Sequence, residues 1–132
     1  MDNDRVAQQT IELILARQLA TSLAVPVVLF DEHGDPIFIN EAGEALLGIR
    51  VEDFDRQSLD AWVTVFRPRT LEGKPLAAAS LPFVQAILKR HPSHGSMLVA
   101  GPDGERAIDI TAFPLEGGRG RLLGAVAMFW DH

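Results

Sequence analysis

The sequence of 132 residues contains no cysteine, which excludes disulfide bonds, thiolate nucleophiles and zinc sites built on cysteine. It also has no excess of basic residues, because 12 lysines and arginines stand against 18 aspartates and glutamates and the net charge is −6. The basic residues are scattered along the chain and form no stripe on any predicted helix or strand. We therefore expect no nucleic-acid partner.

No apolar run approaches the roughly 20 residues that a helix needs to cross a bilayer, so we expect no membrane segment. The N-terminus is acidic, whereas a secretory signal would be basic. These absences together indicate a cytoplasmic protein. With 47% hydrophobic residues and a mean hydropathy of +0.10, the chain is one domain by size and can bury a core.

The stretch 25–48 is the part around which the rest of the chain is best interpreted. Two apolar runs, Val25 to Phe30 and Pro36 to Ile39, flank a polar turn, which is typical of a β-hairpin. Asn40 follows and is a favoured N-cap for a short helix that ends at Gly48.

Residues 3–23 are predicted to form an amphipathic helix, because apolar residues recur there at steps of three and four. We accordingly divide the chain into this helix, at residues 1–23, and a second unit at residues 24–132. A helix with so wide an apolar face must pack on its own sheet or pair with a second copy, and the pattern leaves both open.

The remaining segments indicate a helix followed by three strands. Residues 81–90 are predicted to be helical, and strands are predicted at 95–100, 105–115 and 122–130, between glycine-containing turns. Residues 59–66 fit either a helix or a strand. With the first hairpin this gives five antiparallel strands, with central helices on one face and the N-terminal helix on the other, which is the α+β class.

No arrangement of residues points to catalysis. Ser22, Ser58 and Ser80 lack the context of a nucleophile elbow, and Ser58 and Ser80 suit helix caps. The aspartates and glutamates of the later turns suit turn and outward strand positions better than a carboxylate pair. We therefore expect no enzymatic activity and no metal site.

The order of these pieces resembles a PAS domain, the small sensory module of signalling proteins. The resemblance rests on Asp31, Gly34, Ile37, Asn40 and Ala42 in the first hairpin and helix, and on the later runs 102–104, 113–115 and 124–126. It implies a non-catalytic sensory module of bacterial signal transduction that docks to a signalling effector protein. The lack of cysteine excludes the flavin–cysteinyl photochemistry of some PAS relatives.

The resemblance also raises a haem-based gas or redox sensor, with His91 as an axial ligand, since haem-binding PAS domains place a histidine in or near the corresponding helix. The other interpretation is a polar helix terminus, where a charged histidine near the last carbonyls is favourable. His91 does not fall at the offset expected from haem-binding relatives. We therefore predict no cofactor.

The last two strands are apolar on both faces. By analogy with PAS domains the face of Ile108 and Phe129 looks inward, where small alanines leave room for a small apolar ligand beneath the helix at 81–90. The candidate pocket residues are Trp62, Phe83, Ile87, Leu98, Ile108, Ile110, Ala125, Ala127 and Phe129. The alternative is a core already filled by aromatic side chains, which would leave a pure dimerisation or adaptor module.

The apolar outer face of the final strand requires a cover, because a half-solvated antiparallel sheet would carry polar residues there. The N-terminal helix is the expected cover, from the same chain or from the partner in a homodimer. The candidate interface residues are Ile11, Ile14, Leu15, Leu19, Val126, Met128 and Trp130. We thus expect a homodimeric sensor that signals through this helix.

Overall fold

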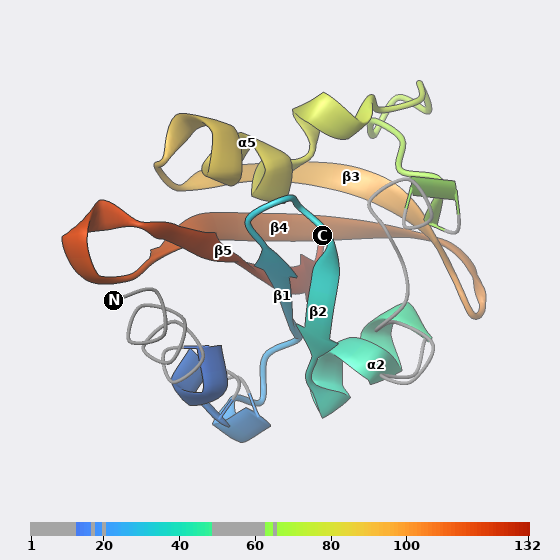
Figure 1. Cartoon of the computed structure of the whole chain (residues 1–132). Coiled ribbons are helices and arrows are strands. Elements are labelled where there is room, and N and C mark those ends of the chain that lie inside the picture. The colour runs from blue at the N-terminus through green and yellow to red at the C-terminus, as the bar shows by residue number, and fades with distance from the viewer. Residues whose placement is uncertain (1–12, 17, 20, 49–62, 65) are drawn as a thin grey trace.

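The computed structural model describes the chain except residues 1–12, 17, 20, 49–62 and 65. One antiparallel sheet of five strands, in the order β2-β1-β5-β4-β3, lies at its centre (Figure 1). The predicted α+β class and the five strands are confirmed.

The first hairpin forms where the sequence predicts it. β1 spans Val27–Asp31 and β2 spans Pro36–Ile39. The carboxylate of Asp31 closes the turn between them, because its Oδ1 accepts the backbone N–H groups of His33 at 2.9 Å and Asp35 at 3.0 Å.

Helix α2, Glu41–Leu47, follows the hairpin directly. Asn40 is its N-cap and accepts the N–H of Gly43 at 2.8 Å through Oδ1, as expected from the sequence. The helix ends at Gly48, whose φ of 70° favours glycine and whose Cβ, were it present, would meet the ring of Pro102.

Helix α5, Pro82–Lys89, follows a short 3-10 turn, η1, at Ala78–Ser80. Its N-cap position is Leu81, which makes no side-chain cap, and proline occupies its first turn. The prediction that Ser80 caps this helix is wrong, because Ser80 belongs to the preceding 3-10 turn. Of the ambiguous segment 59–66, residues 63, 64 and 66 are helical and the others lie outside the described residues.

Strands β3 (Ser93–Gly101), β4 (Gly104–Glu116) and β5 (Leu122–Asp131) form the predicted succession of antiparallel strands. A short 3-10 turn, η2, at Gly118–Gly120 joins β4 to β5. β5 returns to the centre of the sheet, where it pairs with β1 as well as with β4.

Gly124 stands opposite Asp31 where β5 pairs with β1. A Cβ at this position would lie 1.8 Å from the carbonyl oxygen of Phe30. Only glycine can occupy this position without a shift of the backbone.

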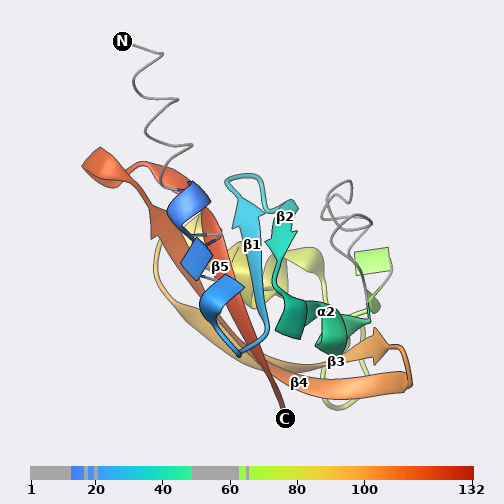
Figure 2. The ribbon, with the colours of Figure 1, turned by 90° about the horizontal axis from the view of Figure 1, so that it is seen from below.

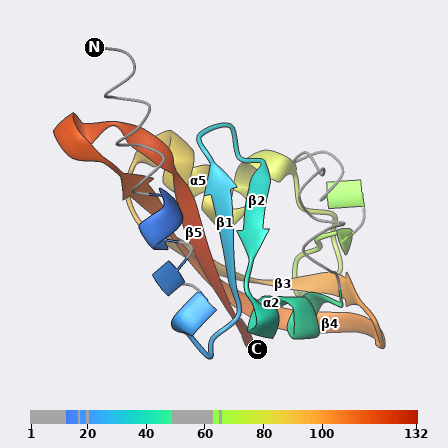
Figure 3. The ribbon, with the colours of Figure 1, turned by 60° about the horizontal axis from the view of Figure 1, so that its bottom comes forward.

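The two faces of the sheet are covered by different elements. α5 packs on β3, β4 and β5, and the N-terminal segment lies on the opposite face beside β1 and β5 (Figures 2 and 3). The described helical residues of that segment are 13–16, 18, 19, 21 and 22. Residue 23 is not helical, and the other positions of the helix predicted at 3–23, including Ile11, lie outside the described residues. Within the described residues no helix is long and apolar enough to span a membrane.

Candidate functional site

The inner face of the sheet, which looks toward α5, brings six of the nine candidate pocket residues into one buried cluster. These six, each at most 1% exposed, are Phe83, Ile108, Ile110, Ala125, Ala127 and Phe129. Ile87 of α5 is partly buried and packs against them. Trp62 lies outside the described residues. The alternation along β4 and β5 therefore directs side chains as the sequence predicts.

Two stacked aromatic rings occupy the space beside the alanines of β5. The rings of Phe30 and Phe83 have centroids 3.8 Å apart and planes inclined by 4°. Phe30 stands opposite Ala125 in the register of β1 with β5, and a small side chain there leaves room for a ring. Phe30 is not among the predicted pocket residues, although the alternation of β1 places it on the inner face.

Leu98 does not belong to the inner face. Its neighbours Met97 and Val99 are 1% exposed in the core, and Leu98 between them is only half-buried on the opposite face. Its backbone pairs with Arg69 through both the N–H and the carbonyl oxygen. The prediction for Leu98 is wrong, because three successive apolar residues carry no alternation from which a face can be assigned.

The outer face of the sheet has an apolar cluster of its own. Val27 and Leu29 of β1 are fully buried there, and Val126 and Met128 of β5 are partly buried beside them. Ala16 of the N-terminal segment packs against this cluster. The N-terminal segment thus covers part of the outer face.

The larger apolar residues of the N-terminal segment do not make this cover. Ile14, Leu15 and Leu19 are 47%, 59% and 65% exposed, and Trp130 at the end of β5 is 41% exposed. Within one chain Ala16 is the residue of the N-terminal segment that packs against the outer cluster, and the contact of Ile14, Leu15 and Leu19 with a partner stays a prediction.

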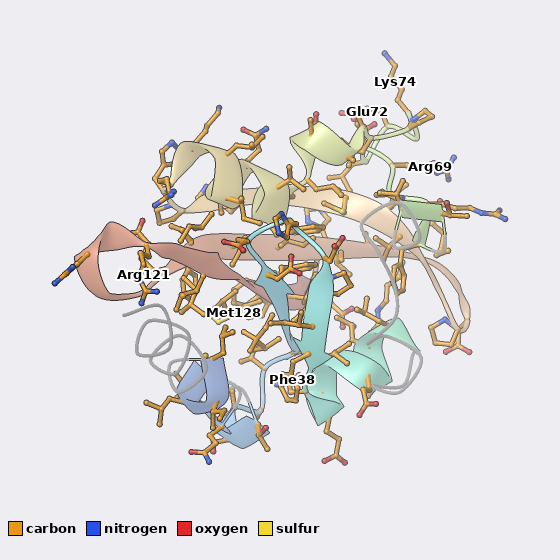
Figure 4. All side chains as sticks on the ribbon, in the orientation of Figure 1. Phe38, Arg69, Glu72, Lys74, Arg121 and Met128 are labelled. Atoms are coloured by element: carbon orange, nitrogen blue, oxygen red, sulfur yellow. The ribbon has the colours of Figure 1, made fainter. Side chains whose placement is uncertain are left out.

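An open groove of about 600 Å³ lies between the N-terminal segment and β2. Ile14 and Phe38 form its apolar walls, and Gln18, Thr21 and Ser22 supply polar groups. Figure 4 shows Phe38 on this side of the hairpin. The groove has the volume of a small-molecule site but is open to solvent along its length.

Asn40 joins the N-terminal segment to the hairpin and to α2. It is 2% exposed, and its Oδ1 accepts the N–H of Val27 at 2.9 Å in addition to that of Gly43. Its Nδ2 donates to the carbonyl oxygens of Leu23 at 3.3 Å and Val25 at 2.8 Å. The sequence predicts the cap on α2 but not the other three bonds, because their partners lie 13 to 17 positions away.

Polar side chains bridge the last three strands. Oδ1 of Asp109 accepts the hydroxyl of Ser96 at 2.6 Å and lies 2.7 Å from Nδ1 of His132. The guanidinium of Arg106 donates to both carboxylate oxygens of Asp131, at 2.7 and 3.0 Å. The bond from Ser96, reinforced by His132, lowers the pKa of Asp109, and the bond from Arg106 lowers the pKa of Asp131. Ser96 is bonded to the aspartate and not to the histidine, so this group does not form a nucleophile with its base.

His91 is exposed at the end of α5, with its Nδ1 3.1 Å from the carbonyl oxygen of Pro92. It stands outside the buried cluster of the inner face. Its position suits the polar helix terminus and gives the haem alternative no support. Among the residues described, no three His, Asp or Glu side chains are grouped to hold a metal ion.

The same architecture occurs in PAS domains of known structure. The PAS domain of BvgS from Bordetella pertussis is 16% identical over 92% of this chain and 85% of that chain, with a TM-score of 0.63. The PAS domain of nitrogen regulation protein NR(II) from Vibrio parahaemolyticus is 13% identical over 89% and 98%, with a TM-score of 0.63. VqmA bound to DPO is 19% identical over 90% and 57%, also with a TM-score of 0.63. No protein-family model and no curated protein matches the sequence.

Proposed function

We propose, from the premise that this chain has the PAS fold, that it is a non-catalytic sensory and interaction module that acts as a homodimer. Its N-terminal segment forms the dimer contact and carries the signal between the sheet and an effector protein. As a sensor, the module responds to a small apolar ligand or to a partner. A pure dimerisation or adaptor module with a filled core is the alternative, and it has no small-molecule trigger.

The exposed apolar residues of the N-terminal segment carry this proposal. Ile14, Leu15 and Leu19 project from one short helical stretch, and the groove bounded by Phe38 lies beside them. Apolar surface left in water costs roughly 25 cal/mol per Å² relative to burial. A second copy that seats these side chains in the groove of its partner, with the reciprocal contact on the other side, makes a two-fold interface.

Asn40 provides the link from this interface to the rest of the fold. It holds the carbonyl oxygens of Leu23 and Val25 on one side and the N–H groups of Val27 and Gly43 on the other. A shift of the N-terminal segment must therefore act on the start of β1 and on α2 together. A stimulus that favours one arrangement of β1 and α2 then favours one arrangement of the segment.

A small apolar ligand in the core is the second candidate, as the trigger of such a shift. It is supported by VqmA, a structure of the same fold bound to DPO, and by small residues on the inner face such as Ala125 and Ala127. The stacked rings of Phe30 and Phe83 favour the filled core instead. A larger side chain at Ala127 separates the two, because it overpacks a filled core and is tolerated by a cavity.

The oligomeric state of a charged double variant tests the dimer. We expect the wild-type protein to have the mass of a dimer in size-exclusion chromatography with light scattering, and the variant Leu15→Glu with Leu19→Glu to have that of a monomer, because burying the new carboxylates is unfavourable. Leu88→Glu is the matched control, since Leu88 is 66% exposed on α5 and Leu19 is 65% exposed. The control should remain a dimer.

Two outcomes would contradict this interface. One is a wild-type protein that stays monomeric up to the highest soluble concentration. The other is a dimer that survives the double substitution but dissociates in Leu88→Glu, which would move the interface to the face of α5.

A further inference from the structure

Two segments that lie far apart in the sequence form a basic surface on this acidic protein. Lys89 and Arg90 stand at the end of α5, and Arg119 and Arg121 stand in and after the turn from β4 to β5. The two segments lie side by side in Figure 1, and Nη1 of Arg90 holds them together by donating to the carbonyl oxygen of Gly120 at 2.9 Å. We call these four residues the basic corner, and they are four of the 12 basic residues of the chain.

Two of these arginines have backbone conformations that favour glycine. φ is 58° at Arg90 and 64° at Arg119. A side chain with a Cβ is disfavoured in this left-handed region, whereas glycine adopts it freely. Glycine would therefore suit the backbone better at both positions, so the backbone conformation does not explain why arginine is present.

The end of the helix accounts for only part of this charge. Cations beside the last carbonyls of α5 are favourable, and this explains Lys89 and Arg90. It does not explain Arg119 and Arg121, which belong to a connection between two strands. Glu116 is the only acidic residue in the stretches 89–91 and 116–121, so it cannot neutralise the four cations.

Most of the donors in the basic corner remain available to a ligand. Arg90 uses one donor for Gly120, and Arg121 donates Nε to the carbonyl oxygen of Gly118 at 3.3 Å. Lys89 and Arg119 are exposed, and within the described residues neither forms an ion pair. Guanidinium groups bind carboxylates through two parallel hydrogen bonds, which makes arginine the suitable cation for an acidic peptide.

We propose that the basic corner docks an acidic segment of a partner protein, whose carboxylates pair with Arg90, Arg119 and Arg121. A protein partner is favoured over a nucleic acid because the basic surface is a short corner and the whole chain carries a net charge of −6. This inference rests on the proposed function only in that the module passes its signal to an effector protein. The basic corner is the surface of that contact, and arginine–carboxylate pairing is its chemistry.

The test measures binding of a fluorescein-labelled hexaglutamate peptide by fluorescence polarisation at low ionic strength. The double variant Arg90→Gly with Arg119→Gly should bind about tenfold more weakly or worse, because it loses two charge-assisted contacts. Its melting temperature should change little, because glycine adopts the φ values of both positions freely while the exposed bond from Arg90 to Gly120 is lost. Added salt should weaken the wild-type complex.

The matched control removes two cations from the other end of the sheet. Arg67 also has a positive φ, of 45°, and both Arg67 and Lys74 are exposed. Figure 4 shows Lys74 and Arg121 at opposite ends of the molecule. The control variant Arg67→Gly with Lys74→Ala has the same net charge as the test variant and should keep the affinity of the wild type.

Three results would overturn the proposal. The first is no binding of the peptide to the wild-type protein, or equal binding to the wild type and the test variant. The second is an equal loss in the test and control variants, which would assign the binding to net charge alone. The third is tighter binding of a 12-nucleotide single strand of DNA than of the peptide. Light scattering on the same samples gives the oligomeric state, so a loss of peptide binding can be told apart from a loss of the dimer.

Discussion

Ala127 stands on the inner face of β5, fully buried in the cluster that includes the stacked rings of Phe30 and Phe83. Ala127→Leu adds an isopropyl group to a space that these rings already fill in part. We expect this substitution to lower the free energy of unfolding by about 1–3 kcal/mol, because overpacking forces side chains from their preferred rotamers. Urea denaturation of the variant beside the wild type measures the change.

Ala45→Leu, on the exposed side of α2, is the control and should change the stability by no more than about 0.5 kcal/mol. An Ala127→Leu protein as stable as the wild type would mean that the core holds free volume. If native mass spectrometry then showed an apolar adduct in the wild type and none in the variant, the ligand would be the better interpretation.

Single residues also show how far local pattern can predict this structure. Asn40 is recognisable as a cap because the cap depends on the next three residues, whereas its bonds to Leu23, Val25 and Val27 depend on how the chain folds back. The alternation around Ile108 and Phe129 assigns the inner face correctly. No such signal exists at Leu98, where pairing with β4 decides the face.

Among the elements, the N-terminal segment depends most on one side chain. Asn40→Ala removes one cap and three further hydrogen bonds at a site that is 2% exposed. We expect a loss of about 2–4 kcal/mol in the free energy of unfolding, since buried N–H and carbonyl groups lose their partner. Hydrogen exchange at the amides of Val27 and Gly43 should become faster.

Asn40→Asp separates the two functions of this residue. The aspartate keeps an acceptor for Val27 and Gly43 but loses the Nδ2 donor to Leu23 and Val25. It should preserve slow exchange at Gly43 while loosening the N-terminal segment. If the alanine variant were as stable as the wild type, Asn40 could not be the link between these elements.

The elements themselves were predictable to different degrees. The hairpins follow from apolar runs separated by turn residues, and these signals lie within a few positions of each other. The helical period of the N-terminal segment reveals an apolar face, but it does not tell that the sheet meets this face at Ala16 and leaves Leu15 and Leu19 exposed. The neighbour of a helix is a property of the assembled fold.

The free energy of unfolding of the whole molecule should fall at low pH, because carboxylates bridge its last strands. The folded protein lowers the pKa of Asp109 and Asp131, so each contributes stability above its unfolded pKa and loses it as the pH falls through its folded pKa. We expect the urea midpoint to fall between about pH 5 and about pH 3, where aspartates protonate.

The combined variant Asp109→Asn with Asp131→Asn should start from a lower midpoint at about pH 5 and show a smaller fall over this interval. Glu72→Gln, in an exposed loop away from these contacts, should follow the wild-type curve. A double variant whose midpoint declines as steeply as that of the wild type would assign the acid sensitivity to other groups.

The charge distribution of the whole molecule lies beyond what the sequence could predict. The basic residues look scattered along the chain, and the basic corner arises only because Arg90 reaches Gly120, 30 positions later. The order of the strands in the sheet likewise depends on contacts between distant parts of the chain, because local signals predict the strands but not which strands pair.

That sheet order constrains how the protein can be made. β5 is the last of the five strands of this sheet to leave the ribosome, yet it forms the middle of the sheet between β1 and β4. Until residues 122–131 emerge, the β1–β2 and β3–β4 hairpins share no neighbour, and isolated hairpins are marginally stable. Until then the edges of β1 and β4 that pair with β5 in the finished sheet stay unpaired, and the sheet closes only through contacts between distant parts of the chain. Chaperones that shield such edges during translation should affect its yield more than that of a helical bundle of equal length.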